Sequence, residues 1–196
     1  METYTNYDMC KECGGVCCLA SGCAYLPQDF ESMDFEYLKE KIEEGNITIC
    51  GSIFGKFANY TAWSFFMYLK VSNFGEKNVN FIGGTAPCSL YTPDGCPLSL
   101  EERPSYAKTV KPTQVGGPCD QTMPHEEFRE AWAKHFDVLA QLVKYFTNKD
   151  AIELFKEELI VKDHTYESLK VLPFYYPQYA LNMGPKLIRK KDDGQY

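Results

Sequence analysis

Hydrophobic side chains recur with the period of a helix in three parts of the chain. Residues 124–146 place apolar side chains at steps of three and four, which predicts the longest helix of the protein, an amphipathic helix in its C-terminal part. A second helix is expected over 32–44, with Ser32 as its N-cap and Gly45 just beyond its end. A third, shorter amphipathic helix is expected over 151–159.

Other segments are rich in β-branched and aromatic residues, a composition that favours strands. These segments are 47–50, 60–72 and 79–82. Gly51 and Gly55 are expected to join the first strand to the second, and the turn formers at 73–75 to join the second to the third. The short connections predict a small antiparallel sheet and, together with the helices, the α+β fold class. The aromatic stretch 172–179 is expected to be irregular, and 186–196 to be a flexible tail.

The chain has 196 residues and is expected to form a single domain, 1–196, without an internal repeat. Within it, residues 10–119 contain every cysteine, and residues 120–185 form a helical C-terminal part. Residues 86–119 carry six prolines and little hydrophobic periodicity. That composition is typical of a loop that presents ligands.

Charge and hydropathy argue against several classes of protein. The chain has 20 basic and 27 acidic residues, a net charge of −7, whereas nucleic-acid-binding proteins present a basic surface. The longest apolar stretch, 54–71, is interrupted by Lys56, Asn59, Ser64 and Lys70, so no membrane span is predicted. The N-terminal residues lack the pattern of a signal peptide, and we therefore expect a cytoplasmic protein. The sequence leaves open whether the protein binds a protein or peptide partner.

Cysteine is the unusual component of this composition, with nine residues in the chain. Dense cysteine in a reducing compartment indicates metal or redox chemistry rather than disulfides. Cys50 stands alone in a predicted strand and is most simply a small buried hydrophobic residue. The remaining eight are the candidate metal ligands: Cys10, Cys13, Cys17, Cys18 and Cys23 in a first group, and Cys88, Cys96 and Cys119 in a second.

The first group begins with a C-x2-C pair, Cys10 and Cys13, whose thiolates can converge on one metal while the backbone turns. Gly14 and Gly15 permit the positive φ that such a turn needs. Adjacent side chains usually diverge, so the pair 17–18 is expected to serve different centres or a multinuclear cluster. Eight thiols suffice for two four-thiolate sites, or for one site with spare thiols.

The spacing favours an iron–sulfur cluster, of the [4Fe–4S] type, over zinc. Zinc ribbons need a second C-x2-C pair, which this chain lacks, whereas short-spaced cysteine runs hold iron–sulfur clusters. Zinc stays the alternative, in a zinc-stabilised, non-enzymatic binding module, and metal-free redox thiols are a third reading. An isolated pair at Cys88 and Cys96 could not complete a four-ligand site, so we expect this segment to fold back onto the N-terminal cysteines.

The residues CKECGGVCC, then GCAYLPQDF and CSLYTPDGCPLSLEERP, resemble the CxxCxxCC family of zinc- or iron-chelating proteins. That family is similar to the cysteine cluster region of flagellin lysine-N-methylases, and the resemblance covers residues 10–119. It implies that seven cysteines carry metal, with Cys23 as a further ligand: Cys10, Cys13, Cys17, Cys18, Cys88, Cys96 and Cys119. The chain departs from the pattern in two ways, with three residues between Cys13 and Cys17, and with Ala107 where many members have a cysteine.

A cluster of this kind would serve redox chemistry or peptide modification, and the methylase resemblance implies S-adenosylmethionine and a lysine substrate. The chain has no methyltransferase glycine loop, so whether it is an enzyme stays open and no catalytic residue is assigned. The three histidines, His125, His135 and His164, are expected to be solvated or structural rather than ligands. Arg103 could either donate to a cluster thiolate or be a surface residue, and Asp29 is as consistent with a helix cap as with a catalytic role.

Overall fold

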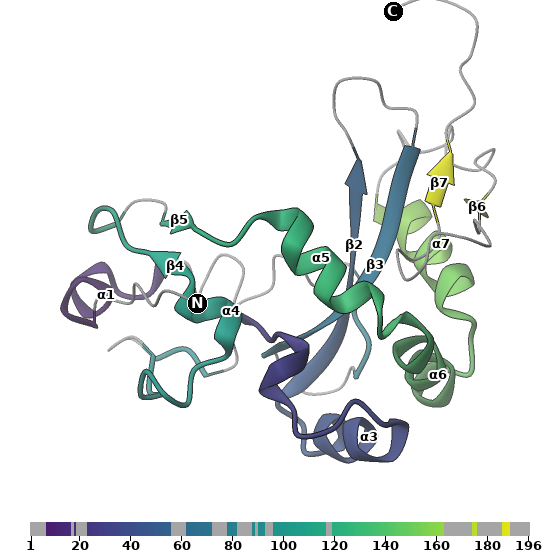
Figure 1. Cartoon of the computed structure of the whole chain (residues 1–196), viewed down its shortest axis with the longest axis horizontal. Coiled ribbons are helices and arrows are strands. Elements are labelled where there is room, and N and C mark those ends of the chain that lie inside the picture. The colour runs from purple at the N-terminus through teal and green to yellow at the C-terminus, as the bar shows by residue number, and fades with distance from the viewer. Residues whose placement is uncertain are drawn as a thin grey trace, which may run out of the picture.

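The computed structural model describes residues 7–16, 18, 23–55, 62–71, 78–81, 88, 90–92, 96–116, 119–162, 174–175 and 186–188. Helices and short strands alternate with irregular segments, which is an α+β architecture (Figure 1). Its helical elements are α1 (Tyr7–Cys13), η1 (Pro27–Asp29), α3 (Phe35–Glu43), α4 (Ser105–Lys108), α5 (His125–Ala133), α6 (Phe136–Thr147) and α7 (Ala151–Lys162). Its strands are β1 (Cys23–Ala24), β2 (Ile47–Gly55), β3 (Ala62–Val71), β4 (Val110–Lys111), β5 (Asp120–Gln121), β6 (Phe174–Tyr175) and β7 (Lys186–Ile188).

Strand β3 is the centre of the main sheet. β2 pairs with it antiparallel over its whole length, from Ile47 opposite Val71 to Gly55 opposite Trp63. On its other edge, β3 pairs antiparallel with β1 at one end and with β7 at the other, and β7 in turn pairs with β6. The predicted small antiparallel sheet is therefore confirmed, while β4 and β5 form a separate two-stranded ribbon.

Glycine 51 lies inside β2 and not in the predicted turn. A Cβ at Gly51 would lie 2.8 Å from the Phe65 ring and 3.0 Å from the Phe81 ring, so the missing side chain permits close packing of two aromatic residues. Gly55 is likewise the last residue of β2. The expected strand at 79–82 is represented by one parallel bridge, between Val79 and Ile49.

Helices cover both faces of the sheet. On one face, the rings of Phe66 and Tyr68 lie 6.1 and 5.3 Å from the ring of Phe128 in α5. On the other face, Phe65 stacks on Phe155 of α7 at 4.0 Å and meets Phe136 of α6 edge-on at 6.2 Å. Figure 1 shows α5 crossing β2 and β3, with α6 and α7 to the right of the sheet. Burial on both faces explains why β3 is apolar at nearly every position.

The expected helices over 32–44 and 151–159 are present as α3 and α7, with a shifted start in the first case. Asp34 is the N-cap of α3, and its backbone N–H donates to Ser32 Oγ at 3.0 Å. Gly45 follows the helix with φ +91°, the left-handed conformation that glycine adopts readily.

The single long helix predicted over 124–146 is wrong, because the structure divides it into α5 and α6. The backbone at His135 has φ −111° and ψ 14°, and its N–H donates to the carbonyl of Trp132 at 2.9 Å. This break separates the two helices so that each packs against a different face of the sheet.

The C-terminal segments also differ from expectation at the residues that the structure describes. Residues 174–175, within the stretch expected to be irregular, form β6, and residues 186–188, within the expected tail, form β7. The N-terminal half of β3 offers its second edge to β7, and backbone pairing there outweighs the polar composition of the tail. The rest of both segments, and the predicted turn at 73–75, lie outside the described residues. Within the described part of the chain, none of the helices has the length and apolar character needed to cross a membrane.

A buried hydrogen bond connects α5 to the segment after β1 and generates the first prediction. Trp132 is fully buried, and its Nε1–H donates to the carbonyl of Tyr25 at 3.0 Å. Trp132→Phe should lower the free energy of unfolding by about 2–3 kcal/mol, because it leaves that carbonyl without this donor and a gap in the core. Urea denaturation followed by circular dichroism measures the change.

Tyr145→Phe is the matched control, since it also removes one aromatic hydrogen-bond donor. The Tyr145 side chain is 53 % exposed, and its hydroxyl lies 3.4 Å from Glu43 Oε1. Surface changes of this kind usually stay within about 0.5 kcal/mol. Equal losses in the two variants would contradict the importance of the buried contact.

Candidate metal site

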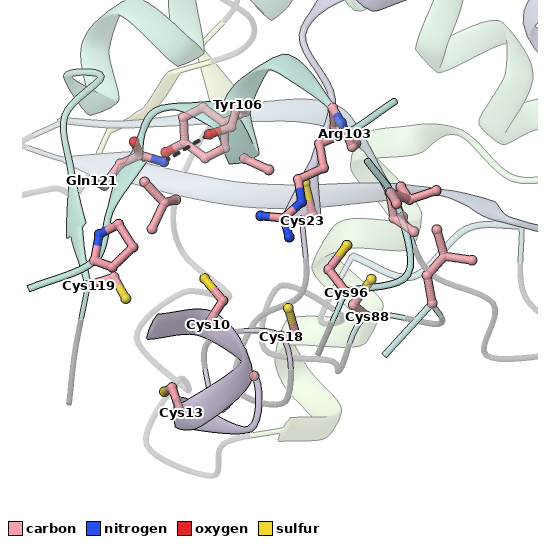
Figure 2. A pocket seen from close by; sticks show the side chains of 18 of the residues that line it. Cys10, Cys13, Cys18, Cys23, Cys88, Cys96, Arg103, Tyr106, Cys119 and Gln121 are labelled. Carbon is pink, nitrogen blue, oxygen red and sulfur yellow. Dashed lines mark hydrogen bonds between the residues drawn. The ribbon is translucent and has the colours of Figure 1, made fainter. Parts of the chain in front are cut away.

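Seven cysteines line one cavity of about 310 Å³ beside the end of β3 (Figure 2). They are Cys10, Cys13, Cys18, Cys23, Cys88, Cys96 and Cys119. The structure thus brings together seven of the eight predicted ligands, all of them as thiols rather than disulfides. Cys17 lies outside the described residues. Cys50 is buried in β2 away from the cavity lining, as expected for a hydrophobic core residue.

Five separate parts of the chain supply these thiols, one of them the residue Cys18 between α1 and β1. Helix α1 carries Cys10 and Cys13, and β1 begins with Cys23, which pairs with Val71 at the end of β3. Cys88 and Cys96 come from the proline-rich segment, and Cys119 directly precedes β5. In Figure 1, α1, α4 and the β4–β5 ribbon lie together to the left of the sheet.

Backbone contacts hold the second cysteine group against the first. The N–H of Cys88 donates to the carbonyl of Cys18 at 2.7 Å, and the N–H of Gly116 donates to Cys13 Sγ at 3.3 Å. The expected return of the proline-rich segment to the N-terminal cysteines is therefore present in the structure. That the two groups share a metal stays a prediction.

Asp29 ties two sides of the cavity together. Its carboxylate accepts hydrogen bonds from the N–H of Leu26, at 2.8 Å, and from the N–H of Ser105, at 2.9 and 3.1 Å for its two oxygens. The first bond caps η1, which follows the β1 segment, and the second fixes the start of α4. Asp29 thus acts as a helix cap, one of its two expected roles, and it also links η1 to α4 across 76 residues of sequence.

Arg103 is a buried residue of the cavity wall and not an ordinary surface arginine. Its side chain is only 9 % exposed, and Figure 2 shows the guanidinium reaching into the cavity on the side of Cys23 and Cys96. His125 and His135 do not line the cavity; their rings lie against Phe128 and Trp132. His164 lies outside the described residues.

Burial dominates the acid–base properties of the cavity thiols. It raises the pKa of Cys23 well above its ordinary value, and Cys88, Asp29 and Cys96 add to the rise. Burial also raises the pKa of Cys88. Near pH 7 these side chains are neutral thiols, and a bound cation would reverse the effect by stabilising the thiolates.

The donor set suits soft metals and clusters, but the side chains are not assembled as a finished site. Among the described cysteine, histidine, aspartate and glutamate residues, no group of three or more could hold a metal ion as the side chains stand. A thiolate-bound metal would therefore have to draw several of these sulfurs together. The residues present therefore fit a thiolate-bound metal in kind and in location, and binding requires convergence within the cavity.

Sequence reasoning missed two polar features of this region. Tyr106 and Gln121 line the cavity opposite the cysteine loops, and the Gln121 amide donates to the Tyr106 carbonyl at 3.5 Å (Figure 2). Lys70 is 1 % exposed, and burial lowers its pKa, while the nearby thiols of Cys50, Cys88 and Cys23 oppose that shift. The burial of Lys70 could have been predicted from its position in a largely apolar strand segment.

The approach of Tyr91 to Gly15 joins the two cysteine groups and yields the second prediction. Gly15 has φ +68°, and a Cβ there would lie 2.9 Å from the Tyr91 ring. Gly15→Ala should lower the free energy of unfolding by about 2–4 kcal/mol, from the left-handed backbone and from displacement of the ring. Denaturation in urea measures it, and Gly15→Ala combined with Tyr91→Ala should show less than additive loss.

Gly14→Ala separates these two causes. Gly14 has φ +63°, but a Cβ there would meet no atom within 4 Å. This variant should show the backbone cost alone, about 1–2 kcal/mol. If the two alanine variants are equally stable, and Tyr91→Ala adds its full effect to Gly15→Ala, the contact does not hold the cavity together.

Comparison of the chain with protein-family models, with curated proteins and with solved structures finds no match. The functional reading of the cavity therefore depends on its residues.

Proposed function

We propose that this chain is a metal-binding protein that holds one or more iron–sulfur clusters, of the [4Fe–4S] type, through its cavity cysteines. In this proposal the metal staples the N-terminal cysteine loop to the proline-rich segment. The cluster serves redox chemistry or the modification of a peptide or lysine side chain. The observation that carries the proposal is that seven cysteines line one cavity, although the first and the last, Cys10 and Cys119, are 109 residues apart in the sequence.

Number and volume support a cluster over a single zinc ion. One structural zinc takes four ligands, so it would leave at least three of the seven lining thiols unused. The cavity, of about 310 Å³, has room for several atoms beyond the ligands. Its apolar wall, with residues such as Leu90, Leu98 and Val110, would shield a cluster from solvent.

Zinc remains the second candidate because the elements around the cavity are short. α4 has four residues, and β4 and β5 have two each, so they bury little apolar surface of their own. A structural metal would supply the missing cohesion, as in small zinc domains. Ala107, the position where the CxxCxxCC family often has a cysteine, lines the cavity and is a place where an added thiol could reach the metal.

Metal analysis of the full chain, purified without oxygen, tests the function. An iron–sulfur protein will contain iron and acid-labile sulfide in fixed proportion to the chain and will absorb visible light. A colourless protein with stoichiometric zinc would replace the cluster by the zinc-stabilised module, and a chelator would then unfold the cavity region. Fresh protein that holds neither metal would overturn the proposal.

Cysteine variants identify the ligands and give the third prediction. Cys96→Ser and Cys13→Ser should each lower the bound metal and the melting temperature to a similar extent, because losing one ligand forfeits most of the binding energy of its centre. Cys50→Ser is the control and should keep its full metal content. Full metal and normal stability in Cys96→Ser, together with loss of both in Cys13→Ser, would show that the second group does not share the site.

A further inference from the structure

The cavity thiols fall into two groups. Figure 2 shows Cys88 and Cys96 close together on the side where Arg103 enters, and Cys119 on the opposite side of the cavity, beyond Cys10. Cys88 and Cys96 lie near enough to Cys23 to raise its pKa, and Cys96 likewise raises the pKa of Cys88. The Cys88 backbone bonds directly to that of Cys18. We therefore define the inner group as these four residues: Cys18, Cys23, Cys88 and Cys96.

The remaining three described thiols make contacts of their own. Cys10 and Cys13 are three residues apart on α1, so they lie on one face of that helix. Gly116, three residues before Cys119, donates its N–H to Cys13 Sγ. The outer group is therefore Cys10, Cys13 and Cys119, which belong to α1 and to the segment before β5.

Two buried cations accompany the inner group. Among the described residues, the buried cationic side chains are Lys70, Arg103 and Arg129. Arg103 lines the cavity on the inner-group side. Lys70 is not a lining residue, but it pairs with Ala24, the neighbour of Cys23, and it lies within electrostatic range of Cys50 first and then of Cys88 and Cys23. The nearby carboxylate of Asp29 is bound to two backbone N–H groups. Positive charge therefore exceeds negative charge among the buried side chains around these four thiols.

That arrangement suits an anion, and a four-thiolate centre is one. Four thiolates around either a zinc ion or an oxidised [4Fe–4S] core carry two units of net negative charge. Burying a dianion is costly unless cations accompany it, and burying a lysine is costly unless an anion does. The two costs offset each other when the centre and the cations are buried together.

We propose that Cys18, Cys23, Cys88 and Cys96 form one dianionic four-thiolate centre, that Cys10, Cys13 and Cys119 serve a second metal centre, and that Lys70 and Arg103 hold the first centre by supplying buried positive charge. This proposal rests on the proposed function. Lys70 and Arg103 act through the centre and are positioning residues rather than ligands.

The main experiment is Lys70→Met in the metal-loaded full chain, the fourth prediction. Methionine keeps roughly the length and the apolar stem of the lysine side chain but removes its charge. The affinity for metal, measured by competition with a chelator, should therefore fall about tenfold or more. For an iron–sulfur centre the midpoint potential should also fall, because reduction adds negative charge that Lys70 stabilises. Lys70→Arg should restore both quantities toward the unsubstituted values.

Arg129→Met is the matched control, since Arg129 is also a buried cation, at 6 % exposed, but lies on α5 with its guanidinium 3.9 Å from the Glu130 carboxylate. It should change stability without changing metal affinity or potential. Equal metal affinity in Lys70→Met and Arg129→Met would overturn the role of the lysine. An unsubstituted chain that binds no metal would instead overturn the proposed function itself.

Pairs of cysteine variants test the grouping even if Lys70→Met fails to fold. Cys18→Ser with Cys88→Ser should lose no more metal than either single change, because both remove the same centre. Cys10→Ser with Cys88→Ser should lose more than either alone, because the two changes affect different centres. Additive loss in the first pair, or no further loss in the second, would overturn the division into two groups.

Discussion

The pairing of β3 on both of its edges is the constraint on which the structure depends. β2 accompanies this strand over its whole length, and the opposite edge is shared between β1 and β7. Because β1 is only two residues long, its place is set by Val71 and Lys70 rather than by its own packing. The sheet therefore fixes Cys23 in space, and the cavity forms where the well-packed half of the molecule ends.

Beyond that edge, cohesion comes from a small number of contacts. Most core residues belong to the sheet and to the helices α3, α5, α6 and α7, and the short helix α4 reaches this core through Tyr106, whose ring lies 4.2 Å from that of Phe128. The Asp29 carboxylate joins η1 to α4, the Cys88 backbone joins Cys18, and Gly15 admits the ring of Tyr91. Each contact links segments far apart in sequence, so loss of one leaves little apolar burial to replace it. A region built in this way gains most from a metal that bonds several segments at once.

Local patterns predicted the sheet, α3, α7 and the meeting of the cysteine groups, because periodicity and ligand count are properties of short segments. The sequence at the break between α5 and α6 contains no glycine or proline from which a helix end could be predicted. It arises because Phe128 packs on one face of the sheet and Phe136 on the other, which a straight helix could not reach. Gly51 was misread for a similar reason: its small size serves the rings of Phe65 and Phe81 across the sheet, and only the fold brings them together. The candidate ligands were readable from spacing, but the burial of Arg103 and Lys70 around them was not.

The charge of the chain shows why composition and site chemistry must be separated. Among the described residues, many of the carboxylates that contribute to the net charge of −7 face solvent, such as those of Glu36 and Glu40 on α3 and Glu126 and Glu127 on α5. Water screens these charges, so they determine which polymers the surface repels and have little effect in the cavity. Lys70 and Arg103 contribute only two charges to the total, yet both are buried, where electrostatic interactions are screened far less. An acidic protein can therefore provide a positive environment for the proposed thiolate centre. The electrostatic environment of that centre depends on which charges are buried near it and not on the net charge of the chain.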